Sequence, residues 1–319
     1  MRGSILPLLC CVLLFAPALG EVTTWSCATR PPALPSLPAG LSFSQLICTS
    51  SPIPIFGRAG PLNVSVFSVD LASGAFRLAP LTSSSLATVG AMAAAAAPRK
   101  LWGGVNGGYF WRTDVATFLD TVCQGKTRAD ALAAPSAAAP NAGVGDGAVI
   151  AGGELLASNC DCPGFSRPAV LTINGSSSRV DVLRRGDPPP FGRALDALSA
   201  GPNLVSSNAS GPFINIPKDD DNIGNVFEHS ANTAVGLLPN GTAILVTTDG
   251  YDGCNPFDAS CGTNAFTLAY LMKDYFGVAS AMGMDQGGST TMWVSGVGVV
   301  TNPGRGVRDV FSALFVEEL

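Results

Sequence analysis

Two Asn-Gly turns, each lying between apolar stretches, constrain the fold more than any other feature of this sequence. They are Asn174-Gly175 and Asn240-Gly241. The flanking stretches are residues 169–173 and 179–183 for the first turn, and residues 233–238 and 242–248 for the second. Asn-Gly is typical of a tight hairpin turn, and apolar residues that alternate with polar ones are typical of a half-buried strand. The sequence therefore predicts two antiparallel hairpins.

Further strands and two helices are predicted around these hairpins. The additional strands are residues 63–71 with a returning partner at 75–78, a hairpin over 148–158, a strand over 197–205 bent at Gly201-Pro202, a short strand from Ala279, and 310–316. Helices are expected over the alanine-rich residues 86–97 and over 264–276, where Thr263 is the predicted N-cap and Gly277 closes the helix. Strands outnumber helices, and 37 glycines and 24 prolines fit many turns. We expect an α+β fold with mixed, largely antiparallel β-sheets and flanking helices.

The N-terminus predicts export. Residues 1–20 resemble a secretory signal peptide, with Arg2 before an apolar run and small residues at 18–20. Residues 21–60 are rich in proline and serine and read as an extended N-terminal segment without a fold of its own. Residues 61–319 then form a single domain. We expect a soluble mature chain with no membrane span, located outside the cell or in a lysosome- or vacuole-like lumen.

Cysteines and glycosylation sequons agree with that location. After Cys10 and Cys11 leave with the signal peptide, seven of the nine cysteines remain, an odd number. Two pairings are expected, Cys27–Cys48 and Cys254–Cys261. Cys160-Asp161-Cys162 is too closely spaced for an ordinary zinc site. The sequons begin at Asn63, Asn174, Asn208 and Asn240, and each would be an acceptor in a secretory compartment.

The charge of the chain argues against nucleic-acid partners. The formal net charge is −5 and the isoelectric point is about 4.8, and the basic pair Arg184-Arg185 is isolated. Nucleic-acid-binding domains carry basic surfaces, so a nucleic acid is excluded as the expected partner.

One carboxylate stands out near the C-terminal end. Asp285 follows a run of small and apolar residues and precedes Gly287-Gly288-Ser289-Thr290. Glycines allow the backbone to approach a ligand closely, and the hydroxyl groups of Ser289 and Thr290 would supply hydrogen bonds beside the carboxylate. The alternative is a tight turn whose aspartate caps the next segment.

Two other stretches place polar groups at predicted strand ends. Asp249 ends the second hairpin, at a position where sites commonly lie on a rigid scaffold. Asn106-Gly107-Gly108 ends another apolar run and leads into Tyr109, Phe110 and Trp111. The aromatic residues suit a wall on which a sugar stacks, although a place in the core or in a turn is the commoner role for Tyr109 and Trp111.

Taken in order, these motifs resemble the phosphodiester glycosidase family. The resemblance covers roughly residues 61–319. Its motifs are Asn106-Gly-Gly-Tyr-Phe110, Ala200-Gly-Pro202, Thr233-Ala-Val-Gly236, Asp249-Gly250, residues 262–272, Met284-Asp285-Gln-Gly-Gly-Ser289 and Arg308-Asp-Val310 with the closing strand.

The resemblance implies hydrolysis of a sugar-1-phosphodiester, or a related glycosidic bond, at the anomeric carbon of a carbohydrate or glycoconjugate. It implies Asp285 as nucleophile or base, Asp249 as second carboxylate and Arg308 as the cation facing phosphate. The residues expected to contact the substrate are Asn106, Gly107, Tyr109, His229, Asn232, Thr233, Gly287, Gly288, Ser289 and Thr290. No cofactor is expected, and a bound divalent cation stays open. For Asn106, Asp249 and Arg308 the alternatives are, in turn, a backbone bracket, a turn residue and a surface charge.

Two departures from the family pattern favour a second hypothesis. Asn232 stands where the family usually has an arginine before its Thr-Ala-x-Gly, and Gln286 replaces the first glycine after the aspartate. An arginine is the natural partner of a phosphate. The second hypothesis is therefore a catalytically impaired carbohydrate-binding or cell-surface protein on the same fold. A third is a secreted inhibitor or matrix protein that relies on its cysteines. A serine hydrolase is disfavoured, because His229 is the single histidine and no Gly-x-Ser-x-Gly is present.

Overall fold

The large sheet of this protein has apolar side chains on both of its faces. The computed structural model describes residues 25–30, 36–50, 61–112, 143–145, 147–157, 169–174, 177–182, 195–216, 226, 229–250, 262–301, 303–304 and 306–319. Leu245 and Val246 are neighbours on one strand and belong to different hydrophobic cores. Successive side chains of a strand point to opposite faces, so both faces of this strand must be covered.

The large sheet has the strand order β1-β2-β3-β16-β15-β17-β13-β14. Its strands are β1 (Ser26–Arg30), β2 (Leu41–Ser50), β3 (Leu62–Asp70), β16 (Thr242–Thr248), β15 (Asn232–Leu237), β17 (Ser280–Gly283), β13 (Asn203–Asn208) and β14 (Gly211–Ile214). Residues 21–60 were expected to form an extended segment without a fold of its own. The described residues of this segment instead form β1 and β2 of the large sheet. β2 pairs with β3 over eight residues, from Leu41↔Val69 to Cys48↔Leu62.

Two smaller sheets share one face of the large sheet. The β5 sheet has the order β19-β18-β5-β20-β4, with β19 (Gly298–Val299), β18 (Met292–Val294), β5 (Leu101–Asn106), β20 (Val310–Glu318) and β4 (Phe76–Ala87). The β10 sheet has the order β11-β10-β12-β8-β9, with β11 (Ser177–Val182), β10 (Ala169–Asn174), β12 (Asp196–Ala200), β8 (Val149–Ala151) and β9 (Glu154–Ala157). A short ribbon joins β6 (Phe110–Trp111) to β7 (Val144–Gly145).

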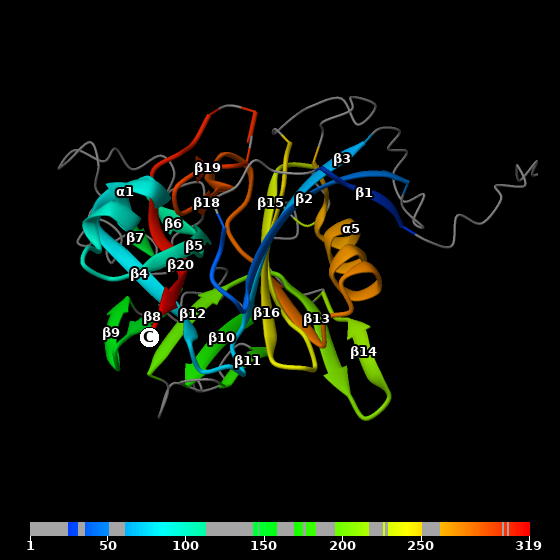
Figure 1. Cartoon of the computed structure of the whole chain (residues 1–319), viewed down its shortest axis with the longest axis horizontal. Helices are drawn as coiled ribbons and strands as arrows, with labels where there is room; N and C mark the ends of the chain where they lie inside the picture. Colours follow the sequence, from blue (N-terminus) through cyan, green and yellow to red (C-terminus); the bar gives the residue numbers. More distant parts are fainter. Residues whose placement is uncertain are drawn as a thin grey trace, which may run out of the picture.

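The layers follow from the distribution of the cores. One core, with Phe67, Leu171 and Leu314 among its members, joins the large sheet to the two smaller ones. On the other face of the large sheet lies α5 (Ala265–Tyr270), which continues as a π-helical turn over Leu271–Tyr275. α1 (Val89–Ala95) covers the outer face of the β5 sheet. Figure 1 shows α5 and α1 on opposite sides of the molecule, with the sheets between them.

The predicted hairpins are confirmed. β10 pairs with β11 from Ala169↔Val182 to Asn174↔Ser177, and β15 pairs with β16 from Asn232↔Thr248 to Leu237↔Ala243. β8 and β9 also form the hairpin expected over residues 148–158. The expectation of largely antiparallel sheets is confirmed, but the expectation of mixed sheets is wrong for the residues that the structure describes, because every strand pairing among them is antiparallel. Within the same residues, α1 and α5 are the α-helices.

The predicted pairing of residues 63–71 with 75–78 is wrong. β3 lies in the large sheet and β4 lies at the edge of the β5 sheet. The turn between them is closed by the Asp70 carboxylate, whose Oδ1 accepts the Ala72 N–H at 3.0 Å. After this turn the chain crosses to the opposite layer, so that Phe67 and Leu78 face the same core from different sheets. Residues 197–205 behave similarly, because Gly201-Pro202 separates β12 from β13.

The helices differ from the predictions at their ends. α1 begins at Val89 because Leu86 and Ala87 still belong to β4, and the Thr88 side chain caps it by accepting the Ala91 N–H at 3.1 Å. Asn264, and not Thr263, caps α5, with its Oδ1 accepting the Thr267 N–H at 2.8 Å. Gly277 has φ of 69° just beyond the helical segment, as its predicted closing role requires.

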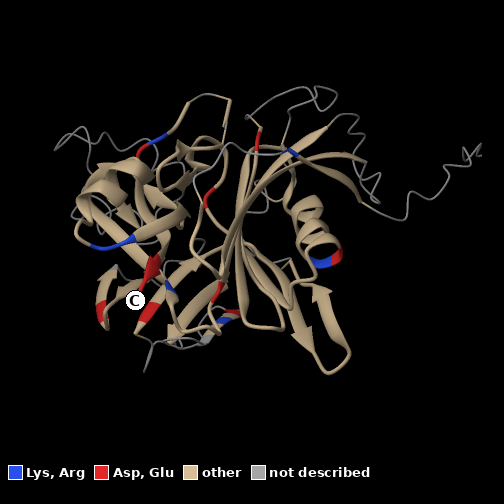
Figure 2. Ribbon diagram, in the orientation of Figure 1, with Lys and Arg blue, Asp and Glu red and all other residues tan. Residues whose placement is uncertain are grey.

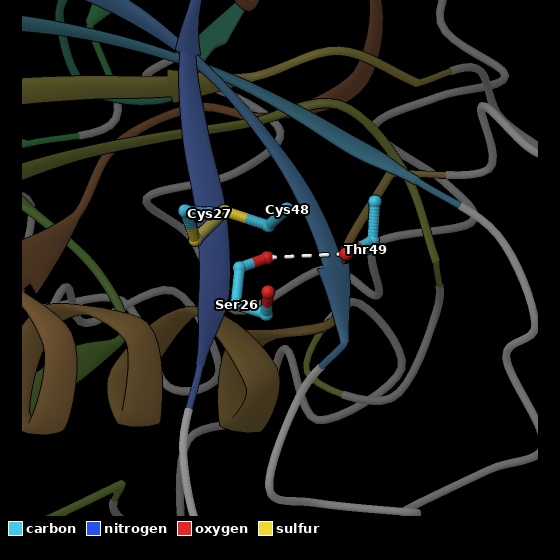
Figure 3. The surroundings of a disulfide bond; sticks show 4 residues. All are labelled: Ser26, Cys27, Cys48 and Thr49. Carbon is cyan, nitrogen blue, oxygen red and sulfur yellow. Dashed lines mark hydrogen bonds between the residues drawn. A yellow bond between two sulfur atoms is a disulfide. The ribbon is translucent and has the colours of Figure 1, made fainter.

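The predicted disulfide Cys27–Cys48 is confirmed. It joins the paired positions of β1 and β2, and Figure 3 shows it beside the Thr49 hydroxyl, which donates to the Ser26 carbonyl at 3.4 Å. The second expected pair, Cys254–Cys261, lies outside the described residues, as do the signal peptide and Cys123, Cys160 and Cys162. Among the described residues, no helix has the length and apolar character needed to cross a bilayer.

Ion pairs connect the two smaller sheets. Glu317 of β20 accepts from Arg99 at 2.6 Å and from Arg77 at 2.8 Å, and Arg77 also reaches Asp196 of β12 at 3.4 Å. Figure 2 shows that charged segments are sparse along the ribbon and that several of them lie beside the C-terminus. The hydrogen bond from Arg99 lowers the pKa of Glu317 below its ordinary value of 4.5, against the opposing effect of burial, and Arg77 lowers it further.

We expect Glu317→Gln to lower the free energy of unfolding by about 2 kcal/mol at pH 7, since two guanidinium groups lose their shared carboxylate in a partly buried setting. The folded pKa lies below the unfolded one. The stabilisation by Glu317 is therefore complete above the unfolded value and is lost as the pH falls through the folded value. Urea unfolding of both proteins between pH 7 and pH 3 should show curves that converge at the acid end. The control is Glu318→Gln, which removes an ion pair with the exposed Lys100 and keeps an oxygen that can accept from the Trp102 Nε1. Equal curves for wild type and Glu317→Gln at pH 7 would contradict the prediction.

Candidate functional site

Four predicted site stretches meet at one end of the interface between the large sheet and the β5 sheet. β17 delivers the chain to Met284, whose N–H donates to the Thr233 carbonyl at 2.9 Å. The next residue, Asp285, donates its N–H to the Gly107 carbonyl at 3.0 Å. The Asp285 backbone is therefore held between the start of β15, in the large sheet, and the end of β5, in the facing sheet.

Asn106 is the residue that connects these stretches. Its Nδ2 donates to the Asp285 carbonyl at 2.7 Å, and its Oδ1 accepts from the Thr233 hydroxyl at 2.7 Å and from the Thr291 N–H at 3.1 Å. The side chain is fully buried. The sequence left open whether Asn106 contacts substrate or brackets the backbone, and these bonds give it the bracketing role. Thr233, also expected to contact substrate, is buried, and its hydroxyl donates to the Asn106 Oδ1.

Asp285 is a nearly buried carboxylate held in a fixed position. Its exposed fraction is 7%, and its Oδ1 accepts the N–H of Gln286 at 2.9 Å. Its backbone N–H and carbonyl are both bonded to the Asn106–Gly107 stretch, which fixes the backbone, and the bond to the Gln286 N–H orients the carboxylate on that backbone. A preorganised carboxylate in a nearly water-free place interacts strongly with charge that develops beside it.

The turn after Asp285 places three small residues against neighbouring chain segments. Gly287 has φ of 65°, a conformation that favours glycine. The Gly287 N–H donates to the Ala231 carbonyl at 2.8 Å, and the Thr290 N–H returns to the Gly287 carbonyl at 3.0 Å. The Thr290 hydroxyl is buried and has no hydrogen-bond partner within the described part of the chain. The turn therefore presents a hydroxyl with unused hydrogen-bonding capacity.

Arg308 lies against this same turn. Its backbone N–H donates to the Gly288 carbonyl at 3.2 Å, and its Nη1 lies 3.5 Å from the Ser289 Oγ. A Cβ added to Gly288 would lie only 2.7 Å from the Arg308 Nη2, so the guanidinium occupies the space that the missing side chain leaves. Arg308 is half-buried, and among the described residues no carboxylate forms an ion pair with it. The sequence prediction that Arg308 and the Asp285 turn come together is consistent with this placement.

Asn232 takes part in a second buried cluster, on the α5 side of the large sheet. Its Nδ2 donates to the Thr263 carbonyl at 2.6 Å and to the Ser230 carbonyl at 3.0 Å, and its N–H donates to the Thr248 hydroxyl at 3.1 Å. The side chain is buried. Asn232 thus joins the ends of β15 and β16 to the segment that precedes α5, and these contacts are with protein groups.

Asp249, His229 and Tyr109 flank these clusters. Asp249 follows Thr248 directly, is half-buried, and donates its N–H to the Asn63 carbonyl at 3.0 Å. His229 is half-buried and precedes the bridge between Ser230 and Thr263. Tyr109 is half-buried after the Asn106–Gly108 stretch. The three residues therefore lie on segments adjoining the Asp285 and Asn232 clusters, and their contact with a substrate stays a prediction.

Sequence reasoning missed the residues that hold these clusters together. Thr248, Thr263 and Thr291 accept or donate the bonds described above, and the Ser312 carbonyl accepts the Gly107 N–H at 2.7 Å. Thr263 carried a signal, but it was interpreted as a helix cap. Thr291 and Ser312 carried none, because a threonine or serine in a strand or just before one is common. Within the described ranges, no three His, Cys, Asp or Glu side chains gather in a way that would hold a metal ion.

Comparison with known proteins supports the fold and the family. The family model described as phosphodiester glycosidase matches residues 104–317. No curated protein sequence matches the chain. The catalytic domain of zebrafish N-acetylglucosamine-1-phosphodiester alpha-N-acetylglucosaminidase, in a form auto-inhibited by its pro-peptide, is similar in structure. Its TM-score is 0.58 at 19% identity, over 92% of this chain and 88% of that one.

A hypothetical protein from Synechocystis is also similar, with a TM-score of 0.60 at 13% identity over 88% of this chain. The match spans only 62% of the Synechocystis chain. At these identities the two structural matches show a shared fold, and the chemistry has to be argued from the site.

Proposed function

We propose, because the chain belongs to the phosphodiester glycosidase family, that it hydrolyses a sugar-1-phosphodiester at the anomeric carbon. In this reaction the bond between the anomeric carbon and the phosphate oxygen breaks. The phosphate monoester leaves with the electron pair, and the oxygen of water ends on the sugar. The substrate class is a carbohydrate or glycoconjugate that carries such a diester.

The observation that carries the proposal is Arg308 on the turn beside Asp285. A partly buried guanidinium is normally paired with a carboxylate. Arg308 has no such partner among the described residues, yet it is fixed by the Gly288 carbonyl and lies 3.5 Å from the Ser289 hydroxyl. A guanidinium presents a planar set of donors that matches the oxygens of a phosphate. Arg308 would therefore hold the phosphate group and stabilise its charge as it leaves.

Asp285 would act at the anomeric carbon. A phosphate monoester is a good leaving group, so one carboxylate can suffice where ordinary glycosidases use a pair. Asp285 is three residues from Gly288, on which Arg308 packs. In this arrangement it attacks the carbon directly or takes a proton from the attacking water. Asp249 is the proposed second carboxylate, and Thr290 offers a hydroxyl for the phosphate or for a sugar hydroxyl.

The test is turnover of a sugar-1-phosphodiester panel beside a matched panel of neutral aryl glycosides. Arg308→Met should lower kcat/KM about 100-fold or more on the phosphodiesters, because it removes the group that meets the leaving charge. On the aryl glycosides, which carry no phosphate, the loss should stay within about threefold by the same reasoning. The control is Arg179→Met, which removes a guanidinium whose side chain is 69% exposed. An equal loss on both panels would remove Arg308 from phosphate recognition.

A second candidate function is carbohydrate binding without catalysis. It is favoured by Asn232, where the related family pattern has arginine. Here the amide donates to the Thr263 and Ser230 carbonyls inside the protein, and it adds no positive charge. Calorimetric binding of the same diesters without release of sugar would support this candidate.

We also propose that the protein enters the secretory pathway. Two sequons lie in exposed hairpin turns, and in both the asparagine Oδ1 accepts the N–H of the sequon's third residue, at 2.8 Å in Asn208 and 3.0 Å in Asn240. The Cys27–Cys48 disulfide also fits an oxidising compartment.

Expression in a secreting eukaryotic host should give protein whose electrophoretic mobility shifts on removal of N-linked glycans. Asn208→Gln and Asn240→Gln should each abolish one step of that shift. A product that stays inside the cell and carries no glycan would contradict the proposed location.

A further inference from the structure

We infer that a glycan on Asn63 restricts the candidate site to small substrates. The inference rests on the proposed hydrolysis and on the proposed secretory location, and it names a substrate class. That class is free sugar-1-phosphodiesters of low molecular mass, in preference to diesters carried on the surface of a protein. Asn63 is the acceptor of the sequon Asn63-Val64-Ser65, and an N-linked glycan is a bulky, solvated group.

The first observation is the place of Asn63 on the large sheet. Its side chain is exposed on β3, whereas Ser65 and Phe67, the next residues on the same side of that strand, are buried. Phe67 belongs to the core that joins the large sheet to the two smaller ones. Asn63 therefore lies on the face that carries the candidate site, at the point where that face opens to solvent and a large attached group can extend from it.

The second observation is a short series of contacts that leads from Asn63 to the candidate site. The Asn63 carbonyl accepts the Asp249 N–H at 3.0 Å, so the two residues are cross-strand neighbours, whose Cβ atoms lie about 5 Å apart in antiparallel sheets. A Cβ added to Gly250 would lie 2.8 Å from the Ala231 nitrogen, and the Ala231 carbonyl accepts the Gly287 N–H at 2.8 Å. A glycan on Asn63 would thus stand beside the proposed second carboxylate and near the turn that holds the phosphate-binding group.

The sequon at Asn240 provides a contrast, because it lies at the opposite end of the same strand pair. Asn240 is in the turn before β16, whereas Asp249 follows the last residue of β16. The seven residues of that strand separate the two positions, which corresponds to about 20 Å or more at the usual rise of a strand. A glycan on Asn240 is therefore a matched control for one on Asn63.

The attachment step follows the ordinary chemistry of a sequon. The Asn63 amide nitrogen bonds to the anomeric carbon of the donor, a lipid-pyrophosphate-linked oligosaccharide. The bond from that carbon to the lipid pyrophosphate breaks, the lipid pyrophosphate leaves with the electron pair, and the amide loses one proton. Attachment takes place on the nascent chain, so the burial of Ser65 in the folded protein does not prevent it.

The expected selectivity depends on the size of the group that carries the diester. A protein-borne diester reaches Asp249 only if the surface of its carrier comes close to Asn63, where the glycan occupies the solvent. A small diester brings no such surface. The glycan should therefore exclude the first kind of substrate and leave the second unaffected.

The experiment uses the full chain secreted from a eukaryotic host that attaches mannose-rich glycans, and mass spectrometry measures the occupancy of Asn63. Two substrates share one sugar-1-phosphate: its methyl diester, and a diester linked through its second alcohol to lysines of serum albumin. Asn63→Gln, and wild type trimmed by an endoglycosidase to one sugar per sequon, should each raise kcat/KM on the albumin substrate about tenfold, with the methyl diester changed by less than about threefold. Asn240→Gln should change neither. The trimmed protein keeps the wild-type sequence, so the test does not depend on how the substitution affects folding.

The outcomes separate this inference from the proposed function. A secreted protein with unmodified Asn63, or turnover with the same ratio in all forms, overturns the inference and leaves the hydrolase. Calorimetric binding that follows the Asn63 glycan, without release of sugar, overturns the hydrolase and supports the role of the glycan. Failure of every form to bind either diester overturns both.

Discussion

Asp285→Asn is expected to reduce kcat on a sugar-1-phosphodiester by about a thousandfold or more while the protein stays folded. The amide keeps the size of the side chain and can still accept the Gln286 N–H through its oxygen. It has no negative charge with which to meet the positive charge that develops at the anomeric carbon. Single-turnover kinetics of purified wild type and variant measure the effect, and thermal unfolding should show midpoints within about 5 °C of each other.

The matched control for this variant is Asp181→Asn, which removes a carboxylate from an exposed ion pair with Arg179. Surface pairs of this kind contribute little to stability, so neither turnover nor unfolding should change measurably. If Asp285→Asn turned over the diester at the wild-type rate, Asp285 would have no part in the mechanism, and its hydrogen bond to Gln286 would be that of an ordinary turn residue.

Asn106→Ala is expected to damage stability and activity together. The substitution leaves three groups without their partner, namely the Asp285 carbonyl, the Thr233 hydroxyl and the Thr291 N–H. Each buried unpaired group costs about 1–3 kcal/mol, so we expect the free energy of unfolding to fall by about 4 kcal/mol. In a chain of this size that corresponds to a midpoint lower by roughly 6 °C. The Asp285 backbone loses its anchor, and kcat should fall with it.

Asn203→Ala separates the two effects. Asn203 is also fully buried, and its Nδ2 donates to the Asn215 carbonyl at 2.6 Å and to the Ser206 hydroxyl at 3.2 Å, on β13. Its loss should lower stability without changing kcat of the folded protein by more than about threefold. A stable Asn106→Ala variant with a raised KM and an unchanged kcat would instead show that Asn106 contacts substrate.

The elements of the fold that could be predicted are those whose conformation is set by residues close together in the sequence. The Asn240-Gly241 turn and the alternation on either side of it specify β15 and β16, because turn geometry and side-chain period act over a few residues. The same holds for Gly277 and for the turn at Gly287. The partners of β3 and β4 were not predictable, since both strands expose apolar faces that pack equally well across a core or along a sheet edge.

The candidate site shows the same division. Asp285 and Asn106 could be selected from the sequence as polar residues beside glycines, and Arg308 from the family resemblance, but the relations among the three could not be predicted. Asn106 bonds to partners that lie 179, 127 and 185 residues away in the chain. No local pattern encodes such bonds, and its bracketing role became visible only once those partners were located.

By itself, the sequence determined the strands of the two Asn-Gly hairpins, their turns and the small set of polar residues near Asp285, but not β1 and β2. The hydrophobic periodicity of a strand and the residues of a turn act between near neighbours in the chain, so both can be read from the residue order. Only the tertiary structure decided that Asn106 holds the Asp285 backbone and that Arg308 rests on Gly288. Those relations depend on which sheets face one another, and that is settled by burying apolar faces across the whole chain.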